Sequence, residues 1–294
     1  MANTIKYQEE WAVKLQERLK KPTNWKECCD VIYSDTQVFE LPYVGTASES
    51  AIQTGLTRGN TYTFQDVTQS TETLSIATYD ILAELLDRAD EAQSNYAKRM
   101  DRAALQGDKI NERLEAIWLS AGASATNFGD TGGGVLGLAT TQITVGDNNV
   151  DNIWSGVIEQ IYTANGATQL NRDGAFIVWR PSDWTFATRF MQSNGFSAAD
   201  AALRNGGTIG IEYGAPKFAH YVSTSHTANH VIAGVKKVLK LGILKSTYGK
   251  TYITEDPAGA SGGNISGISV NSRLDYGTKI PAVASTLLFD VNVV

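Results

Sequence analysis

Cysteine is almost missing from this sequence of 294 residues, which contains only Cys28 and Cys29. Adjacent cysteines rarely bridge each other, and no third cysteine is present to pair with either of them. We therefore expect both thiols to be reduced, as is usual in a cytoplasmic protein. Neither has a histidine nearby, and Lys26 is the one positively charged neighbour, so we predict no reactive thiol.

The sequence also lacks runs of basic residues and long runs of apolar residues. The net charge is −6, and no cluster of lysine or arginine is interleaved with aromatic residues. This argues against a dedicated nucleic-acid-binding protein, although it allows a surface that faces nucleic acid weakly. No stretch of 18 apolar residues occurs, and no charged-then-apolar segment opens the chain. We therefore expect a soluble protein without a membrane segment or a signal peptide.

Histidine is scarce as well, and the three histidines lie close together at His220, His226 and His230. They could ligate a metal, but their spacing fits no known metal motif and no acidic residue adjoins any of them in the sequence. Ser223 or Ser225 could act as a nucleophile with His226, but no G-x-S-x-G motif is present. We expect structural roles for the three histidines.

No other pattern predicts catalysis or cofactor binding. Gly132, Gly134 and Gly137 match G-x-G-x-x-G, but they follow a predicted helix, whereas a dinucleotide site requires a preceding strand. The carboxylates are scattered, and no pair stands out as an acid and a base. We predict no catalytic, cofactor-binding or metal-binding residues, and no enzymatic activity.

The most prominent feature that is present is a long helix predicted at residues 91–121. Asp90 is its expected N-cap, Gly122 its expected stop, and Gly107 its only interruption. Apolar residues recur every three or four positions along one face. At about 1.5 Å per residue the helix would span roughly 45 Å. The alternatives are an ordinary core helix or a short coiled coil. We expect the other face to meet solvent or a partner, because it carries Lys98, Arg99, Asp101, Arg102, Asp108, Lys109, Glu112, Arg113 and Glu115.

The segments before this helix predict an arm and a protruding hairpin. Residues 4–20 form an amphipathic helical pattern, and a shorter helical segment is predicted at 25–31. A strand follows at 36–44, where Pro42 allows only an edge position. We predict a β-hairpin made of strands at 61–68 and 71–79. Both strands are polar, so this hairpin needs a partner surface.

After the long helix, the sequence alternates short helices with strands and contains no internal repeat. We predict a short strand at 143–145, and the last ten residues alternate between polar and apolar as a strand does. Pro181 is expected in the first turn of its helix, with Ser182 or Asp183 as the cap. The fold class is therefore α+β, with a mostly antiparallel sheet. The remaining predicted helices begin near 150, 181 and 197, and the remaining strands lie at 175–180, 209–213, 217–223, 230–255 and 265–285.

Five stretches are similar to parts of a known protein family, namely VGTASESAIQTGLTRGNTYTF, DEAQSNYAKRMDRAALQGDKINERLEAIWL, GAFIVWRPSDWTFATRF, LRNGGTIGIEYGAPKFAHYVS and SVNSRLDYGTKIPAVASTLLF. These stretches and the order of the parts resemble the major capsid protein of tailed bacteriophages, with its Hong Kong 97-type fold. In that family they correspond to the extended loop, the spine helix, the entry to the axial domain, a Gly-rich turn before two strands, and the closing strands.

The resemblance implies a division of the chain into five segments. These are an N-terminal arm (1–36), a first peripheral strand with the extended hairpin loop (37–90), a peripheral domain with a spine helix at 91–121 (91–148), an axial domain (149–240), and strands that return to the axial and peripheral domains (241–294).

The resemblance also implies a function in assembly. The expected product is an icosahedral shell of pentamers and hexamers that encloses double-stranded DNA without reading its sequence. The expected location is the virion, after assembly in the cytoplasm of the host bacterium, with no membrane and no cofactor. A portal and possibly a decoration protein are implied partners. About 35 residues precede the first strand, so a separate scaffolding protein is expected.

Further expectations concern the hairpin and the competing functions. Residues 54–74 contain no lysine, so covalent cross-linking through this loop is not expected. Deleting about residues 56–73 should leave a folded protein that does not assemble.

An encapsulin-type nanocompartment shell that holds a cargo enzyme is one alternative to the capsid function, and a soluble hydrolase using His226 is another. The long helix argues against a phage tail or adhesin-like protein.

Overall fold

The structure is a computed structural model of the chain. It describes residues 20–44, 54, 56–61, 69–87, 99–128, 143–147, 149–193, 219–227, 229–255, 257 and 267–293. The predicted helix at 4–20 lies outside this part of the chain except for residue 20. The predicted strand at 209–213 lies entirely outside it. So do most of the strand at 61–68 and the Gly132–Gly137 motif.

The first of two five-stranded sheets, the β11 sheet, is organised around its longest strand. The neighbours follow the order β1-β9-β11-β10, and β4 also pairs with β11. β4 runs antiparallel to β11 from Thr78↔Tyr276 to Asp87↔Gly267, while β10 and β9 share the other edge of β11. β1 pairs in parallel with β9. The strands are β1 (Asp30–Ser34), β4 (Thr78–Asp87), β9 (Lys240–Leu244), β10 (Thr251–Glu255) and β11 (Gly267–Lys279).

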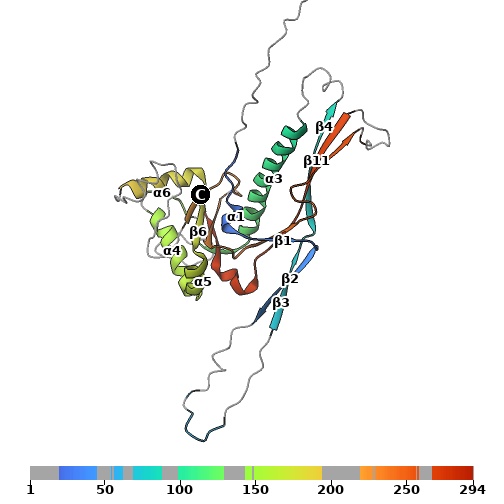
Figure 1. Ribbon diagram of the computed structural model, residues 1–294. Helices are drawn as coiled ribbons and strands as arrows, with labels where there is room; N and C mark the ends of the chain where they lie inside the picture. The colour runs from blue at the N-terminus through green and yellow to red at the C-terminus, as the bar shows by residue number, and fades with distance from the viewer. Residues whose placement is uncertain are drawn as a thin grey trace, which may run out of the picture.

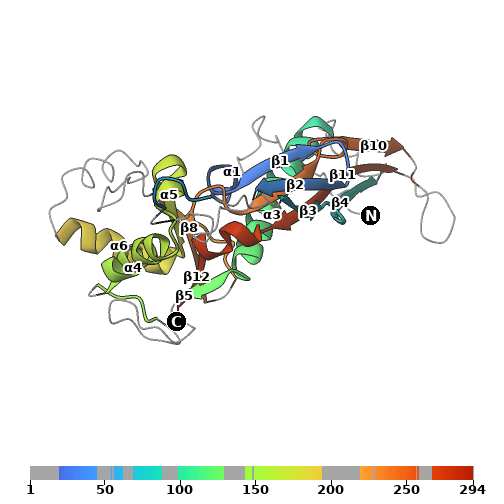
Figure 2. The ribbon, with the colours of Figure 1, turned by 90° about the horizontal axis from the view of Figure 1, so that it is seen from below.

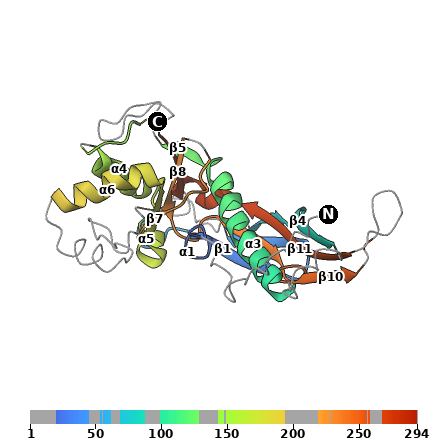
Figure 3. The same cartoon turned by 90° about the horizontal axis from the view of Figure 1, so that it is seen from above.

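The long helix α3 (Arg99–Gly122) packs on one face of the β11 sheet (Figure 3). Its buried Gln106 donates from Nε2 to the carbonyl of Val270 at 2.9 Å and accepts from the Ser272 hydroxyl at 2.7 Å. The helix ends at Gly122 as predicted. Its predicted first turns, at 91–98, lie outside the described residues.

The second sheet, the β8 sheet, has the order β5-β12-β8-β6-β7. Its strands are β5 (Thr126–Phe128), β6 (Ala175–Trp179), β7 (Ala219–Val222), β8 (His230–Val235) and β12 (Leu288–Asn292). Three helices accompany it, namely α4 (Val150–Thr163), α5 (Ala167–Asp173) and α6 (Pro181–Ser193). We had predicted Ser182 or Asp183 as the cap of α6. The helix begins at Pro181, so both residues lie inside its first turn and that prediction was wrong.

Burial in the β8 sheet differs from what simple alternation implies. Every residue of β6 is buried, as its continuous apolar run predicts. Alternation along β12 would place Asp290 in solvent, yet the first four residues of this strand are all buried. α3 contacts β12, and the 3₁₀ helix η3 (Ala282–Leu287) packs against it as well. The strand is therefore covered by elements that local periodicity does not reveal.

A separate two-stranded hairpin is formed by β2 (Val38–Val44) and β3 (Gln69–Ser75). They pair antiparallel from Val38↔Ser75 to Val44↔Gln69. We had predicted that the segment at 71–79 pairs with 61–68. That predicted pairing was wrong, because β3 pairs with β2. The polar residues at 69–70 resemble a tight turn between two strands, but they belong to β3 itself. Pairing across a longer loop adds little cost, because closure entropy grows slowly with loop length.

The molecule is elongated, with the β8 sheet and its helices at one end and the β11 sheet at the other (Figures 1 and 2). The chain crosses between the sheets from α3 to β5, from β8 to β9, and from β11 through η3 to β12. The β2–β3 hairpin projects away from both (Figure 1). None of the described helices is long and apolar enough to span a membrane.

The segment before the β11 sheet contains two short elements. Residues 25–31 were expected to be helical, but α1 covers only Trp25–Cys28, and β1 begins at Asp30. Parallel pairing with β9, more than 200 positions further along the chain, draws this segment into the sheet. Both α1 and the strand therefore belong to the body of the protein.

Candidate assembly elements

His220 is packed among aromatic side chains. It lies on β7, where its Nδ1 accepts a hydrogen bond from the Trp179 indole at 3.0 Å. The Trp154 ring packs edge-on at a centroid distance of 5.2 Å. Burial lowers the pKa of His220 to about 3, which keeps the imidazole neutral. A neutral, fully enclosed imidazole of this kind completes an aromatic core.

His226 and His230 have different partners from His220. The Nε2 of His226 lies 3.2 Å from the carbonyl oxygen of Trp179, and burial, the largest cause, lowers the pKa of His226 to about 4. His230 Nδ1 lies 2.7 Å from the buried carboxylate of Asp290, which comes from the neighbouring strand β12. The fold thus supplies an acidic neighbour that the local sequence lacks.

The histidines therefore do not form one site. Among the residues that the structure describes, no three histidine, cysteine, aspartate or glutamate side chains are grouped so that they could hold a metal ion. Ser223 is buried, and its hydroxyl accepts from the Ser225 amide at 3.2 Å. Because His226 directs Nε2 to a carbonyl and its Nδ1 has no partner in the described structure, the hydrolase alternative finds no support.

Cys28 and Cys29 are both buried and form no disulfide. Burial, the largest cause, raises the pKa of each thiol well above its ordinary value. The thiols therefore stay protonated at neutral pH, and a thiol in that state is a poor nucleophile.

Three carboxylates of α3 hold the segment at residues 20–25. Asp108, Glu112 and Glu115 are spaced i, i+4 and i+7, so they lie along one stripe of the helix. Asp108 forms a 3.0 Å ion pair with Lys20. Glu112 accepts from the Lys21 amide at 3.4 Å. Residues 20–25 therefore run along α3 in the same direction as the helix.

Glu115 makes the strongest of these contacts. Its Oε2 accepts from the amides of Asn24 and Trp25 at 2.8 and 3.0 Å, and from the Trp118 indole at 2.7 Å. We had expected the face with Glu112 and Glu115 to meet solvent or a partner, but both side chains are buried. The expectation fails at these two residues because the chain's own segment before β1 covers this stripe. No local signal around Glu115 could have revealed the contact.

The hairpin is joined to the body at the base of β3. Glu72 accepts from the Ala282 amide at 2.8 Å, and its other oxygen lies 3.4 Å from Lys279 Nζ. The Ile76 amide donates to the Gln37 carbonyl at 2.7 Å. These contacts connect the hairpin to η3, to the end of β11 and to the turn before β2.

Large apolar side chains remain exposed on β4 and on the hairpin. Tyr79, Ile81 and Leu85 share one face of β4 and are each about half exposed; the Arg273 guanidinium lies 4.5 Å from the Tyr79 ring centroid. Val38 of β2 is also exposed, at 55%. Contiguous exposed apolar side chains of this kind are typical of interaction surfaces.

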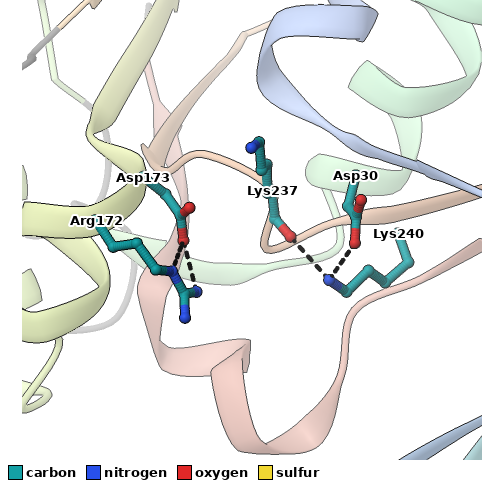
Figure 4. Close-up of polar contacts among 5 residues, drawn as sticks. All are labelled: Asp30, Arg172, Asp173, Lys237 and Lys240. Atoms are coloured by element: carbon teal, nitrogen blue, oxygen red, sulfur yellow. Dashed lines mark hydrogen bonds and ion pairs between the residues drawn. The ribbon is translucent and has the colours of Figure 1, made fainter.

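Two ion pairs lie on either side of the crossing from β8 to β9, where the chain passes between the two sheets (Figure 4). Lys240 Nζ lies 2.6 Å from Asp30 and donates to the Lys237 carbonyl at 3.2 Å. On the β8 side, Arg172 hydrogen-bonds to Asp173 and lowers the pKa of that carboxyl. Lys237 itself has a φ of 63°, which a tight turn requires.

Comparisons with known proteins show which fold this arrangement of elements has. No family model and no curated protein matches the sequence. Among solved structures, the capsid of Ralstonia phage GP4 has a TM-score of 0.64 at 10% identity, covering 99% of this chain and 95% of that one. The capsid of cyanophage P-SCSP1u has a TM-score of 0.63 at 11% identity, covering 98% and 93%. The chain has the Hong Kong 97-type capsid fold.

The match extends over the whole molecule. A chain from Mycobacterium phage Che8 has a TM-score of 0.63 at 18% identity, covering 99% of this chain and 98% of that one. The α+β class and the predicted Hong Kong 97-type fold are therefore confirmed. The candidate functional elements are the hairpin, α3 with its carboxylate stripe, and the exposed face of β4.

Proposed function

We propose that the chain is the major capsid protein of a tailed bacteriophage, and that it assembles into an icosahedral shell around double-stranded DNA. The observation that carries this proposal is the structural match to phage capsids over nearly the full chain. The protruding hairpin adds support, because an isolated two-stranded hairpin is at best marginally stable in water and gains from a neighbour. The exposed apolar face of β4 adds support because such faces are typical of interaction surfaces. The role is structural and not enzymatic.

We also propose the domain division that the sequence suggested. The β11 sheet with α3 as spine helix would be the peripheral domain, and the β8 sheet with α4, α5 and α6 the axial domain. The β2–β3 hairpin would be the base of the extended loop. Of the arm that the sequence suggested at 1–36, only the part before α1 would be an arm, because α1 contacts α3 and β1 belongs to the β11 sheet. What supports this division is that sheet pairing separates the strands into these three groups.

The proposed partners follow from the proposed shell. Copies of the chain would form its pentamers and hexamers, with a scaffolding protein guiding assembly, a portal at one vertex and possibly a decoration protein outside. The net charge of −6 suits a container that must not hold its DNA tightly. The chain would act in the virion, after assembly in the bacterial cytoplasm.

The test is sucrose-gradient sedimentation of the purified full-length protein, alone and with candidate scaffolding proteins, followed by negative-stain microscopy of the fractions. Closed shells tens of nanometres across are expected. Shells recovered from phage-infected cells should also protect DNA from nuclease. Empty shells that protect a cargo enzyme instead would favour a nanocompartment, and a monomer or dimer under every condition would contradict the proposal.

A further inference from the structure

Two glycines face each other in the β11 sheet at the point where the hairpin meets it. Gly242 of β9 and Gly277 of β11 are direct partners in the antiparallel register. Neither has a positive φ, so the backbone at these positions accepts any residue. The requirement for glycine must therefore come from the space above the sheet.

That space is filled by the base of the hairpin. A Cβ at Gly277 would lie 2.0 Å from the Ser75 carbonyl oxygen and 2.8 Å from its carbon. A Cβ at Gly242 would lie 3.0 Å from a Leu74 methyl and 3.1 Å from Ile76 Cγ1. The hairpin thus rests on Gly277 through backbone atoms and on Gly242 through side-chain atoms.

The two apolar residues in this contact are completely enclosed. Leu74 is 0% exposed and Ile76 2% exposed. They do not belong to the large core cluster of the described residues, which contains Trp25, Trp118 and Trp179. The contact is therefore a small, separate packing site that joins the hairpin to the sheet.

The direction of the hairpin depends on this contact together with the contacts of Glu72 to Ala282 and Lys279. β2 has seven residues, so at about 3.3 Å per residue the paired part extends about 23 Å from its base. A tilt of about 20° at the base would move its far end by about 8 Å over that length. Such a displacement exceeds the width of a side-chain contact with a neighbouring subunit.

We propose that the Gly242–Gly277 pair is a seat that sets the direction of the β2–β3 hairpin and so decides whether the hairpin can reach a neighbouring copy of the chain. The two glycines are positioning residues, and Leu74, Ser75 and Ile76 are the hairpin residues that pack against them. The role in assembly rests on the proposed capsid function, whereas the control of hairpin direction does not.

The experiment compares Gly277→Ala, Gly242→Ala and a control, Gly107→Ala, whose added Cβ on α3 meets nothing within 4 Å. Spin labels at Thr71→Cys on β3 and Ser120→Cys on α3 report the hairpin direction, because both positions are exposed and the native cysteines are buried. Labelled chains are diluted into unlabelled chains so that only the intramolecular distance is measured. Tryptophan fluorescence checks the main core, and gradient sedimentation measures shells.

We expect Gly277→Ala to shift the distance distribution and to abolish the shell fraction while tryptophan fluorescence stays native. Gly242→Ala should shift the distance less, because side-chain ends can move aside and a backbone carbonyl cannot. Gly107→Ala should match the wild type in both readouts.

The outcomes separate the two proposals. Wild-type distances in both seat variants would overturn the inference, whether or not shells form. A shifted distance in the seat variants, when the wild-type chain itself never forms shells, would support the seat and count against the capsid function. If Gly277→Ala does not fold, Gly242→Ala decides, since its distance must still differ from that of Gly107→Ala.

Discussion

Glu115 is a buried carboxylate that accepts from four N–H donors, namely the Asn24 and Trp25 amides, the Asn24 side chain and the Trp118 indole. Hydrogen bonds to a charged group contribute about 1.5–3 kcal/mol each, whereas a buried donor left unpaired costs about 1–3 kcal/mol. Two of the donors belong to the backbone at the start of α1. Glu115 therefore acts as a cap that is supplied by another helix, and it fixes where the chain enters the body of the protein.

We predict that Glu115→Ala lowers the free energy of unfolding by about 3 kcal/mol or more, because it leaves these donors buried and unpaired. Glu115→Gln should cost about 1 kcal/mol, since an amide oxygen can still accept without the benefit of charge. Urea unfolding measures the free energy, and hydrogen exchange measures protection of the Asn24 and Trp25 amides.

Asp108→Ala is the matched control for this prediction. It removes a carboxylate of the same stripe, but the ion pair joins a half-buried Asp108 to an exposed Lys20, so the expected cost is below about 1 kcal/mol. Equal effects of Glu115→Ala and Asp108→Ala, or unchanged amide exchange in Glu115→Ala, would show that Glu115 does not anchor the segment.

The histidines predict how stability depends on pH. His220 and His226 have folded pKa values of about 3 and about 4, below the ordinary 6.5. At pH values between the folded pKa of each histidine and 6.5, the unfolded chain binds more protons than the folded one. The free energy of unfolding therefore falls as the pH drops below about 6.5. Near pH 5 each histidine should contribute a slope of about 1 kcal/mol per pH unit.

We expect His226→Gln to reduce this slope by about 1 kcal/mol per pH unit, because glutamine keeps an N–H donor for the Trp179 carbonyl but does not titrate. Urea unfolding of wild type and variant between about pH 4.5 and 6.5 gives both slopes. Parallel curves for the two proteins would show that His226 is not neutral in the folded state.

At the scale of elements, the hairpin is the part that most needs a neighbour. Its two strands pair only with each other in the described structure, and its base is held by Glu72 and by the glycine seat. The deletion of residues 56–73 that the sequence suggested would also remove most of β3. The structure therefore calls for a different variant, one that keeps both paired strands.

We predict that replacing residues 45–68 with Asn-Gly yields a folded chain that forms no shells. Val44 and Gln69 are paired in register, so a two-residue type I′ turn can join them without disturbing the strands. Circular dichroism should stay native, while sedimentation should show only small species. Closed shells formed by this variant would mean that the loop beyond the strands is dispensable for assembly.

At the scale of the whole molecule, one hydrophobic core links both sheets. The core cluster includes Trp154 and Trp179 from the β8 sheet region, Leu241 and Ile243 from β9, and Leu114 from α3. The three crossings between the sheets tie these parts together covalently as well. In a shell, contacts that are individually modest would then add up because they are repeated around every copy. Such assembly needs a body that keeps its shape while the hairpin reaches a neighbour.

Local sequence patterns determined much of this protein. The helix at 99–122, the buried strand β6, the helices α4 and α6, and the edge strand β2 were predicted because their periodicity and end signals depend on residues a few positions apart. The order of the elements likewise predicted the Hong Kong 97-type fold.

Only the tertiary structure decided the contacts between distant segments. It paired β3 with β2, buried Asp290 inside β12, turned Glu115 from an expected surface residue into an anchor, and brought Gly242 opposite Gly277. Helical and strand periodicity describe which side of an element is apolar, but they do not say what covers that side. Pairing and coverage depend on residues separated by tens to hundreds of positions, so only the folded chain brings them together.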